Sequence, residues 1–148
     1  MDIQAELILY SKSFPVELVY NEIGIPGDRF ETADDVIYKT ISGSDYIKEC
    51  ENSITYASKK LNTIYVSETL DDLCSLLLDR LDIIKKMIDN YKLSAKFCIT
   101  LNLTDEPEIV FSNEFVKVSA MLNASIEIDS YIDIEKTIVY DDSDLTKP

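Results

Sequence analysis

The sequence has no histidine and no tryptophan, and only three of its 148 residues are glycine. Without imidazole there is no Ser-His-Asp or Cys-His nucleophile and no imidazole ligand for a metal. With so few glycines, loops that cradle phosphate groups are not expected, and no G-x-G-x-x-G, G-x-x-x-x-G-K-[ST] or G-x-S-x-G motif occurs. We therefore expect a protein that is not an enzyme.

Cysteine is also scarce: Cys50, Cys74 and Cys98 stand far apart in the sequence. Metal-binding cysteines usually come in close pairs, and a disulfide framework needs an even number. We interpret the three as reduced thiols that pack as small apolar side chains in a reducing cytosol. No metal and no cofactor is expected.

Basic residues are few, 14 against 28 acidic ones, which gives a net charge of −14. Such a charge repels nucleic acid and anionic lipid but attracts basic protein surfaces. The first residues lack the basic and apolar regions of a signal peptide, and no apolar run approaches the roughly 18 residues needed to span a bilayer. We expect a cytoplasmic protein that binds a basic protein, and neither nucleic acid nor membrane.

Apolar residues make up 46% of the chain, enough for an ordinary folded core. Apolar and polar residues alternate with a period of two in three segments, which predicts strands with one buried face. The residues on these faces are Ile3, Ala5, Leu7 and Leu9; Ala95, Phe97, Ile99, Leu101 and Leu103; and Ile126, Ile128, Ser130 and Ile132. Residues 36–41 and 53–57 have strand composition, and residues 63–66 are either a third short strand or the tail of a strand.

Two helices are predicted from their end signals. Ser13 is the expected cap of the first, Pro15 fits its first turn, and Gly24 ends it. Ser112 is the expected cap of the other, which ends at Asn123.

Between them, a leucine-rich stripe predicts a helix of about six turns that begins near Thr69 and runs to Tyr91. Strands and helices are thus interspersed. We predict an α+β fold: a single mixed or largely antiparallel sheet with two or three helices packed on one face, the other face being open to water. Residues 1–135 form this domain, and residues 136–148 form an acidic tail.

Several segments resemble one bacterial family. Residues 67–73 (Ser-Glu-Thr-Leu-Asp-Asp-Leu) and the leucine-rich helix resemble its serine/acid entry to an L-x-x-L-L-x-x-L helix. Residues 109–115 (Ile-Val-Phe-Ser-Asn-Glu-Phe) resemble its strand, serine cap and helix start, and residues 122–131 its final L-x-A-x-I-x-I-D-x-Y pattern. The family is the one called domain of unknown function 4279, and the similarity covers roughly residues 3–133.

The resemblance implies no catalytic signature. Some members of the family look like immunity proteins encoded beside polymorphic toxins. The resemblance therefore implies an immunity or antitoxin-like inhibitor that binds a basic effector protein, such as a nuclease toxin.

One local feature offers a binding site. Glu127, Asp129, Tyr131, Asp133 and Glu135 share one side of the last predicted strand, opposite its isoleucines. A row of carboxylates with an aromatic residue among them suits the lysines and arginines of a partner. The alternative is a solvated sheet face that discourages aggregation.

Two other functions stay open. The chain could be a housekeeping module that binds a ligand or assembles with itself, in which case the structure holds an apolar pocket or a two-fold interface. It could also be an enzyme that uses carboxylates alone, which needs two acids buried in one cleft with shifted protonation.

Overall fold

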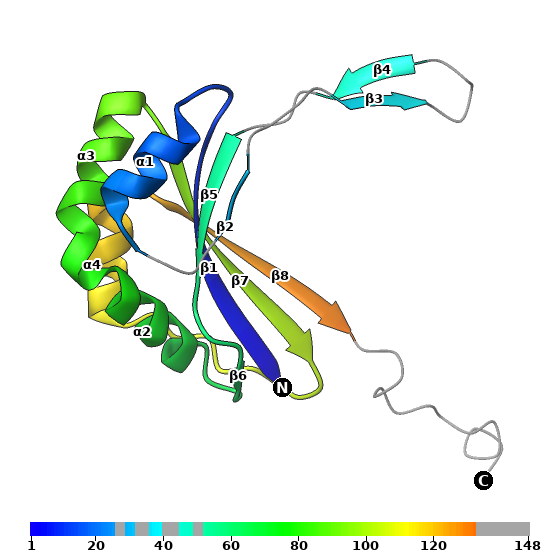
Figure 1. The fold of residues 1–148 in the computed structure, drawn as a ribbon. Helices are drawn as coiled ribbons and strands as arrows, with labels where there is room; N and C mark the ends of the chain where they lie inside the picture. Colours follow the sequence, from blue (N-terminus) through cyan, green and yellow to red (C-terminus); the bar gives the residue numbers. More distant parts are fainter. Residues whose placement is uncertain (26–28, 32–35, 40–44, 49–51, 133–148) are drawn as a thin grey trace, which may run out of the picture.

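The computed structural model describes residues 1–25, 29–31, 36–39, 45–48 and 52–132 (Figure 1). The strands are β1 (Asp2–Ser11), β2 (Arg29–Glu31), β3 (Val36–Lys39), β4 (Asp45–Lys48), β5 (Asn52–Ala57), β6 (Leu61–Asn62), β7 (Ser94–Leu103) and β8 (Ser125–Ile132). The helices are α1 (Val16–Ile23), α2 (Val66–Leu77), the 3-10 turn η1 (Leu78–Arg80), α3 (Leu81–Tyr91) and α4 (Asn113–Met121).

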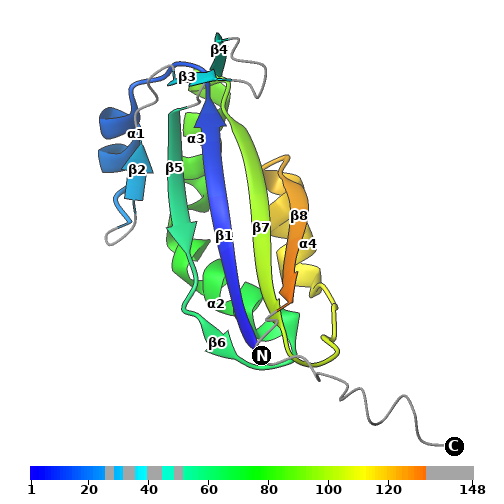
Figure 2. The same ribbon diagram turned by 90° about the vertical axis from the view of Figure 1, so that its right-hand side faces the viewer.

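The main sheet has the order β2-β5-β1-β7-β8, with β6 paired to the start of β1. Every pairing in it is antiparallel except that of β7 with β8, which is parallel. The four α-helices lie on one side of this sheet (Figure 1), and Figure 2 shows the opposite side of the strands with the helices behind them. The predicted α+β class, a mixed sheet with helices on one face, is confirmed. The strands β3 and β4 form a separate two-stranded sheet.

The core lies between the sheet and the helices, where the alternation in β1 placed it. Ile3, Ala5, Leu7 and Leu9 are fully buried, whereas the alternate residues Gln4, Glu6 and Ile8 are half-buried on the other face. Leu7 pairs with Phe97 of β7, and the Phe97 ring meets Phe115 of α4 edge-on at 4.9 Å between centroids. This arrangement joins the two central strands to the last helix.

The long helix predicted from Thr69 to Tyr91 is two helices. Arg80, the last residue of η1 and the N-cap of α3, has φ −119° and ψ 5°, so its backbone leaves the helical region. The bend lets α2 contact β1 and α4 while α3 contacts α1. The sequence stripe does not reveal the bend because Leu77, Leu81 and Ile84 keep helical spacing through it.

Helix ends agree with the prediction in part. Ser112 caps α4, since its Oγ accepts a hydrogen bond from the Phe115 N–H at 3.2 Å. Gly24 ends α1 in the left-handed region with φ 70°. Ser13, however, caps nothing: the N-cap residue of α1 is Pro15, and no side chain bonds to that end.

The region before α2 differs from the prediction. The helix begins at Val66 rather than near Thr69, and Thr69 is fully buried within it. Residues 63–66 are not a strand; the short strand is β6, immediately before them. Tyr65 forms a single bridge with Glu108, so the two connecting segments touch beside the helix start.

The predicted buried face of β8 is wrong. Ile126, Ile128 and Ile132 are 39%, 41% and 64% exposed, and Ser130 is also exposed. The register places Ile126 and Ile128 beside Phe97 and Ile99, which are both fully buried. The isoleucines are therefore on the helix side, but β8 is the last strand of the sheet and they are covered on one flank only.

The predicted tail, residues 136–148, lies outside the described residues. In the part of the chain that is described, no helix is long and apolar enough to cross a membrane.

Candidate functional site

The face of the sheet away from the helices carries the candidate site (Figure 2). Strand pairing aligns its side chains in rows across β1, β7 and β8. One row contains Glu6, Cys98 and Glu127. The next contains Gln4, Thr100 and Asp129, and the one after it Asp2, Asn102 and Tyr131. We call this surface, as formed by these three strands, the open face.

The open face is strongly acidic. Its three strands carry four carboxylates, on Asp2, Glu6, Glu127 and Asp129, and one ammonium group, on Lys96. Lys60, between β5 and β6, adds a second ammonium group at the pocket beside Tyr131. The acids of β1 and β8 are separated by β7, a span of about 10 Å since neighbouring strands lie about 4.8 Å apart. A surface this wide can meet several basic side chains of one partner.

Lys96 is already engaged. Its Nζ lies 3.3 Å from the Glu127 carboxylate and 5.5 Å from the centre of the Tyr10 ring. Burial lowers the pKa of Lys96, but the hydrogen bond and charge of Glu127 outweigh it and hold that pKa above its ordinary value. Lys96 is therefore charged, and it offsets part of the acidic charge of the open face beside Glu127.

Cys98 lies in the middle of these acids. Its thiol is 3.4 Å from Oδ2 of Asp129 and donates a hydrogen bond to it. Burial, that hydrogen bond and the charges of Asp129, Glu127 and Glu6 raise the pKa of Cys98 to about 11. The thiol is protonated at neutral pH and does not act as a nucleophile there.

Tyr131 stands at one end of the open face, 59% exposed. It lines a shallow pocket of about 250 Å³ whose other walls are Asp2, Gln4, Lys60, Thr100 and Asn102. Asp2 is held there by Asn62, whose side-chain amide donates to its carboxylate at 3.1 Å. The pocket therefore combines an aromatic surface, a fixed carboxylate and one lysine side chain.

The structure thus brings together three of the five predicted site residues. Glu127, Asp129 and Tyr131 lie on the same side of β8, whereas Asp133 and Glu135 lie outside the described residues. Glu127 has half of its side chain exposed, and Asp129 is half-buried against Cys98.

Sequence reasoning missed Asp2 and Glu6. The alternation in β1 already placed them opposite the buried residues. The sequence does not reveal the strand order, in which only β7 separates β1 from β8. Without that order, the acids of β1 could not be assigned to the same surface as those of β8.

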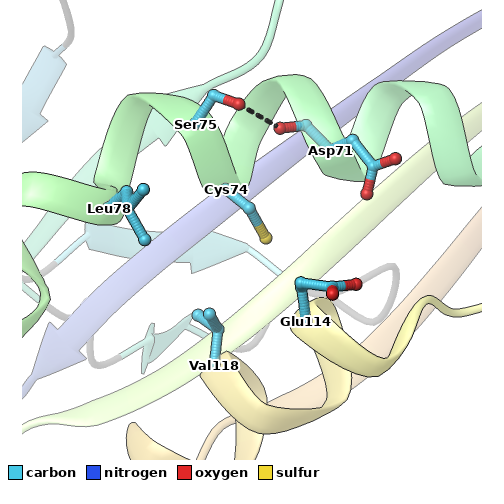
Figure 3. Close-up of a pocket in the computed structure, with 6 residues that line it drawn as sticks. All are labelled: Asp71, Cys74, Ser75, Leu78, Glu114 and Val118. Atoms are coloured by element: carbon cyan, nitrogen blue, oxygen red, sulfur yellow. Dashed lines mark hydrogen bonds between the residues drawn. The ribbon is translucent and has the colours of Figure 1, made fainter.

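A second pocket, of about 320 Å³, lies between α2 and α4 (Figure 3). The Cys74 thiol points into it, with the carboxylates of Asp71 and Glu114 nearby. Burial, Asp71 and Glu114 raise the pKa of Cys74 to about 11, so this thiol is protonated as well. Ser75 is occupied because its Oγ donates to the Asp71 carbonyl at 2.9 Å.

No group of three or more His, Cys, Asp or Glu side chains in the described ranges is arranged to hold a metal ion.

A match to a known family shows which proteins this chain is related to. Residues 1–133 match the family described as Domain of unknown function (DUF4279). The chain belongs to the DUF4279 family. No curated protein and no solved structure gives a significant match. The family match covers all the described strands and helices, so the open face is part of the DUF4279 domain itself.

Proposed function

We propose that this DUF4279 domain is a non-catalytic binding protein that takes a basic protein partner on the open face of its sheet. The observation that carries the proposal is the composition of that face: its three strands hold four carboxylates and one lysine, which is itself paired with Glu127, and Lys60 is the one further cation at its pocket. A face of one sign attracts partners of the other and raises their association rate.

The charged and aromatic side chains of the open face favour the binding of a protein over the binding of nucleic acid. Phosphate contacts require clustered lysine and arginine, whereas Asp2, Glu6, Glu127 and Asp129 repel phosphates. The ring of Tyr131 is 59% exposed and suits a lysine or arginine side chain of the partner that packs its methylenes on the aromatic face.

The chemistry of the described thiols supports binding over catalysis. Cys74 and Cys98 have pKa values of about 11, so neither is a thiolate at neutral pH. The described carboxylates of the open face sit on a surface, not together in a closed cleft.

The most specific form of the proposal is an immunity or antitoxin-like inhibitor. Its mechanism is steering of a basic effector to the open face, followed by occlusion of the effector's substrate groove. The family resemblance supports this form, and the charge of −14 supports the steering step.

The experiment is co-expression with the product of the adjacent gene. The expected result is a stable complex on purification and rescue of growth in cells that express that product. A double variant, Glu127→Gln with Asp129→Asn, removes two charges from the open face without changing side-chain size, and should weaken both binding and rescue at least tenfold.

A matched control removes the same charge elsewhere. Glu22 of α1 and Asp82 of α3 are exposed on the helix layer, on the other side of the sheet. Glu22→Gln with Asp82→Asn should leave binding within about twofold of wild type. If the two double variants lost binding affinity equally, binding would depend on the net charge of the protein and not on the open face. If the wild-type protein forms no complex and rescues no growth, it is not an inhibitor of that gene product.

A further inference from the structure

We infer that the basic partner adds an extended segment as a new strand along the free edge of β8, and that this segment alternates basic and aliphatic residues. The inference rests on the proposed function and specifies how the partner docks and what its chemistry is.

The edge is available in the described structure. β8 is the terminal strand of the sheet, and none of the described residues pairs with its outer side (Figure 2). Its eight residues give an edge of about 26 Å at 3.3 Å per residue. Half of its N–H and C=O groups point away from β7, which is the template that an incoming strand uses.

The two sides of β8 define what the incoming strand carries. On the open face, Glu127 and Asp129 are a step of two residues apart. Glu127 also pairs with Lys96 of β7, but half of its side chain stays exposed, so both acids favour lysine or arginine at the same spacing. On the helix side, Ile126 and Ile128 are 39% and 41% exposed because nothing described covers their outer flank. Aliphatic side chains at the intervening positions would complete that cover.

A second copy of this chain is a poor occupant. When two β8 strands pair antiparallel with their open faces on the same side, a two-fold axis at residue 128 sets Glu127 opposite Asp129. An axis at 127 sets Glu127 opposite its own copy, and an axis at 129 sets Asp129 opposite its own copy. Like charges directly opposite one another destabilise a strand pair. The same row of acids favours a basic strand, so charge selects a foreign segment.

The test uses the full-length, isotope-labelled protein and a capped peptide as long as β8, eight residues, in which lysine and valine alternate. Two control peptides carry glutamate in place of lysine, or the same lysines and valines with all lysines first. Amide hydrogen exchange is followed by NMR residue by residue through β8.

The expected result is a pattern of period two. In the free protein the amides directed to β7 exchange slowly and the outward ones quickly. The alternating basic peptide should slow the outward amides of β8 at least tenfold. The glutamate peptide should have no effect, and the peptide with its lysines grouped should bind without that protection.

Two variants test whether the peptide binds at the edge of β8. Ile128→Lys puts a cation on the edge and should weaken peptide binding at least tenfold. Leu18→Lys is the control: Leu18 is 49% exposed on α1, which contacts β2 and β5 at the opposite end of the sheet. This variant should bind as wild type does.

The outcomes separate this inference from the proposed function. Peptide binding that needs Glu127 and Asp129 but leaves the β8 amides unprotected overturns strand addition, and leaves the open face as the binding surface. No peptide binding, or protection of β8 by all three peptides alike, also overturns strand addition. Binding of the neighbouring gene's product that is unchanged by Glu127→Gln with Asp129→Asn removes the proposed function as well.

Discussion

The thiol of Cys98 on β7 and the carboxylate of Asp129 on β8 are hydrogen-bonded across the parallel strand pair, 3.4 Å apart. The bond ties the edge strand to the body of the sheet at the centre of the open face. It also makes Cys98 a reporter of the local potential, because its pKa of about 11 depends on burial, Asp129, Glu127 and Glu6.

Asp129→Asn should make Cys98 more reactive. Loss of the acceptor charge lowers the pKa of Cys98 toward its ordinary value, and each pKa unit is about a tenfold change in thiolate at a fixed pH below the pKa. We expect alkylation of Cys98 at pH 8 to accelerate about three- to tenfold, measured by peptide mapping. In wild type the rate should keep rising with pH until about 11. An unchanged rate in the variant, with the fold intact, would show that Asp129 does not set this pKa.

Thr69→Val should stabilise the protein. Thr69 is fully buried in α2, and its Oγ1 has no hydrogen-bond partner among the described residues. Valine has almost the same shape and removes the buried hydroxyl, so the free energy of unfolding should rise by about 1 kcal/mol in denaturant titrations. The control Thr104→Val, at an exposed position after β7, should stay within about 0.5 kcal/mol of wild type.

Substitutions at two positions with left-handed backbone, Gly24 and Lys92, should change the stability of the protein in opposite directions. Gly24 has φ 70°, and a Cβ there would meet its nearest atom at 3.7 Å, so the cost of Gly24→Ala is conformational and not steric. We expect a loss of about 1 kcal/mol of stability. Lys92, at the end of α3, has φ 52° and is exposed, so Lys92→Gly should gain up to about 1 kcal/mol. Thermal unfolding measures both, and changes of the same sign would contradict the assignment.

Ser112→Ala should cost about 1 kcal/mol of stability, because it leaves the Phe115 N–H without its cap. Ser13→Ala is its matched control and should change stability by less than about 0.5 kcal/mol, since Ser13 makes no cap at α1. Equal losses in both variants would restore Ser13 as a capping residue.

These two serines show what sequence can and cannot predict about helix ends. Both precede a helix, and both have the residue type that favours capping. At α1 the chain enters the helix through Pro15, whose position sets the first turn without a side-chain bond. The residue types correctly predicted that a helix begins near each serine. The path of the backbone decided whether the serine side chain reaches the N–H groups of the first turn.

The strands show a similar division. Alternation in β1 and β7 predicted their buried faces because both strands are flanked on each side by another strand and covered by helices. The same alternation in β8 predicted the right side of the sheet and the wrong burial, since a period of two does not reveal that a strand is at the edge. Strand order is a long-range property, and it also hid Asp2 and Glu6 from the predicted site.

The central claim, that the open face steers a basic partner, is tested most directly by stopped-flow association with the product of the adjacent gene. The association rate constant of wild type should fall at least tenfold between about 50 and 500 mM salt. At low salt, Glu127→Gln with Asp129→Asn should associate several-fold more slowly than Glu22→Gln with Asp82→Asn. A rate that is independent of salt, and equal in the two double variants, would contradict the account.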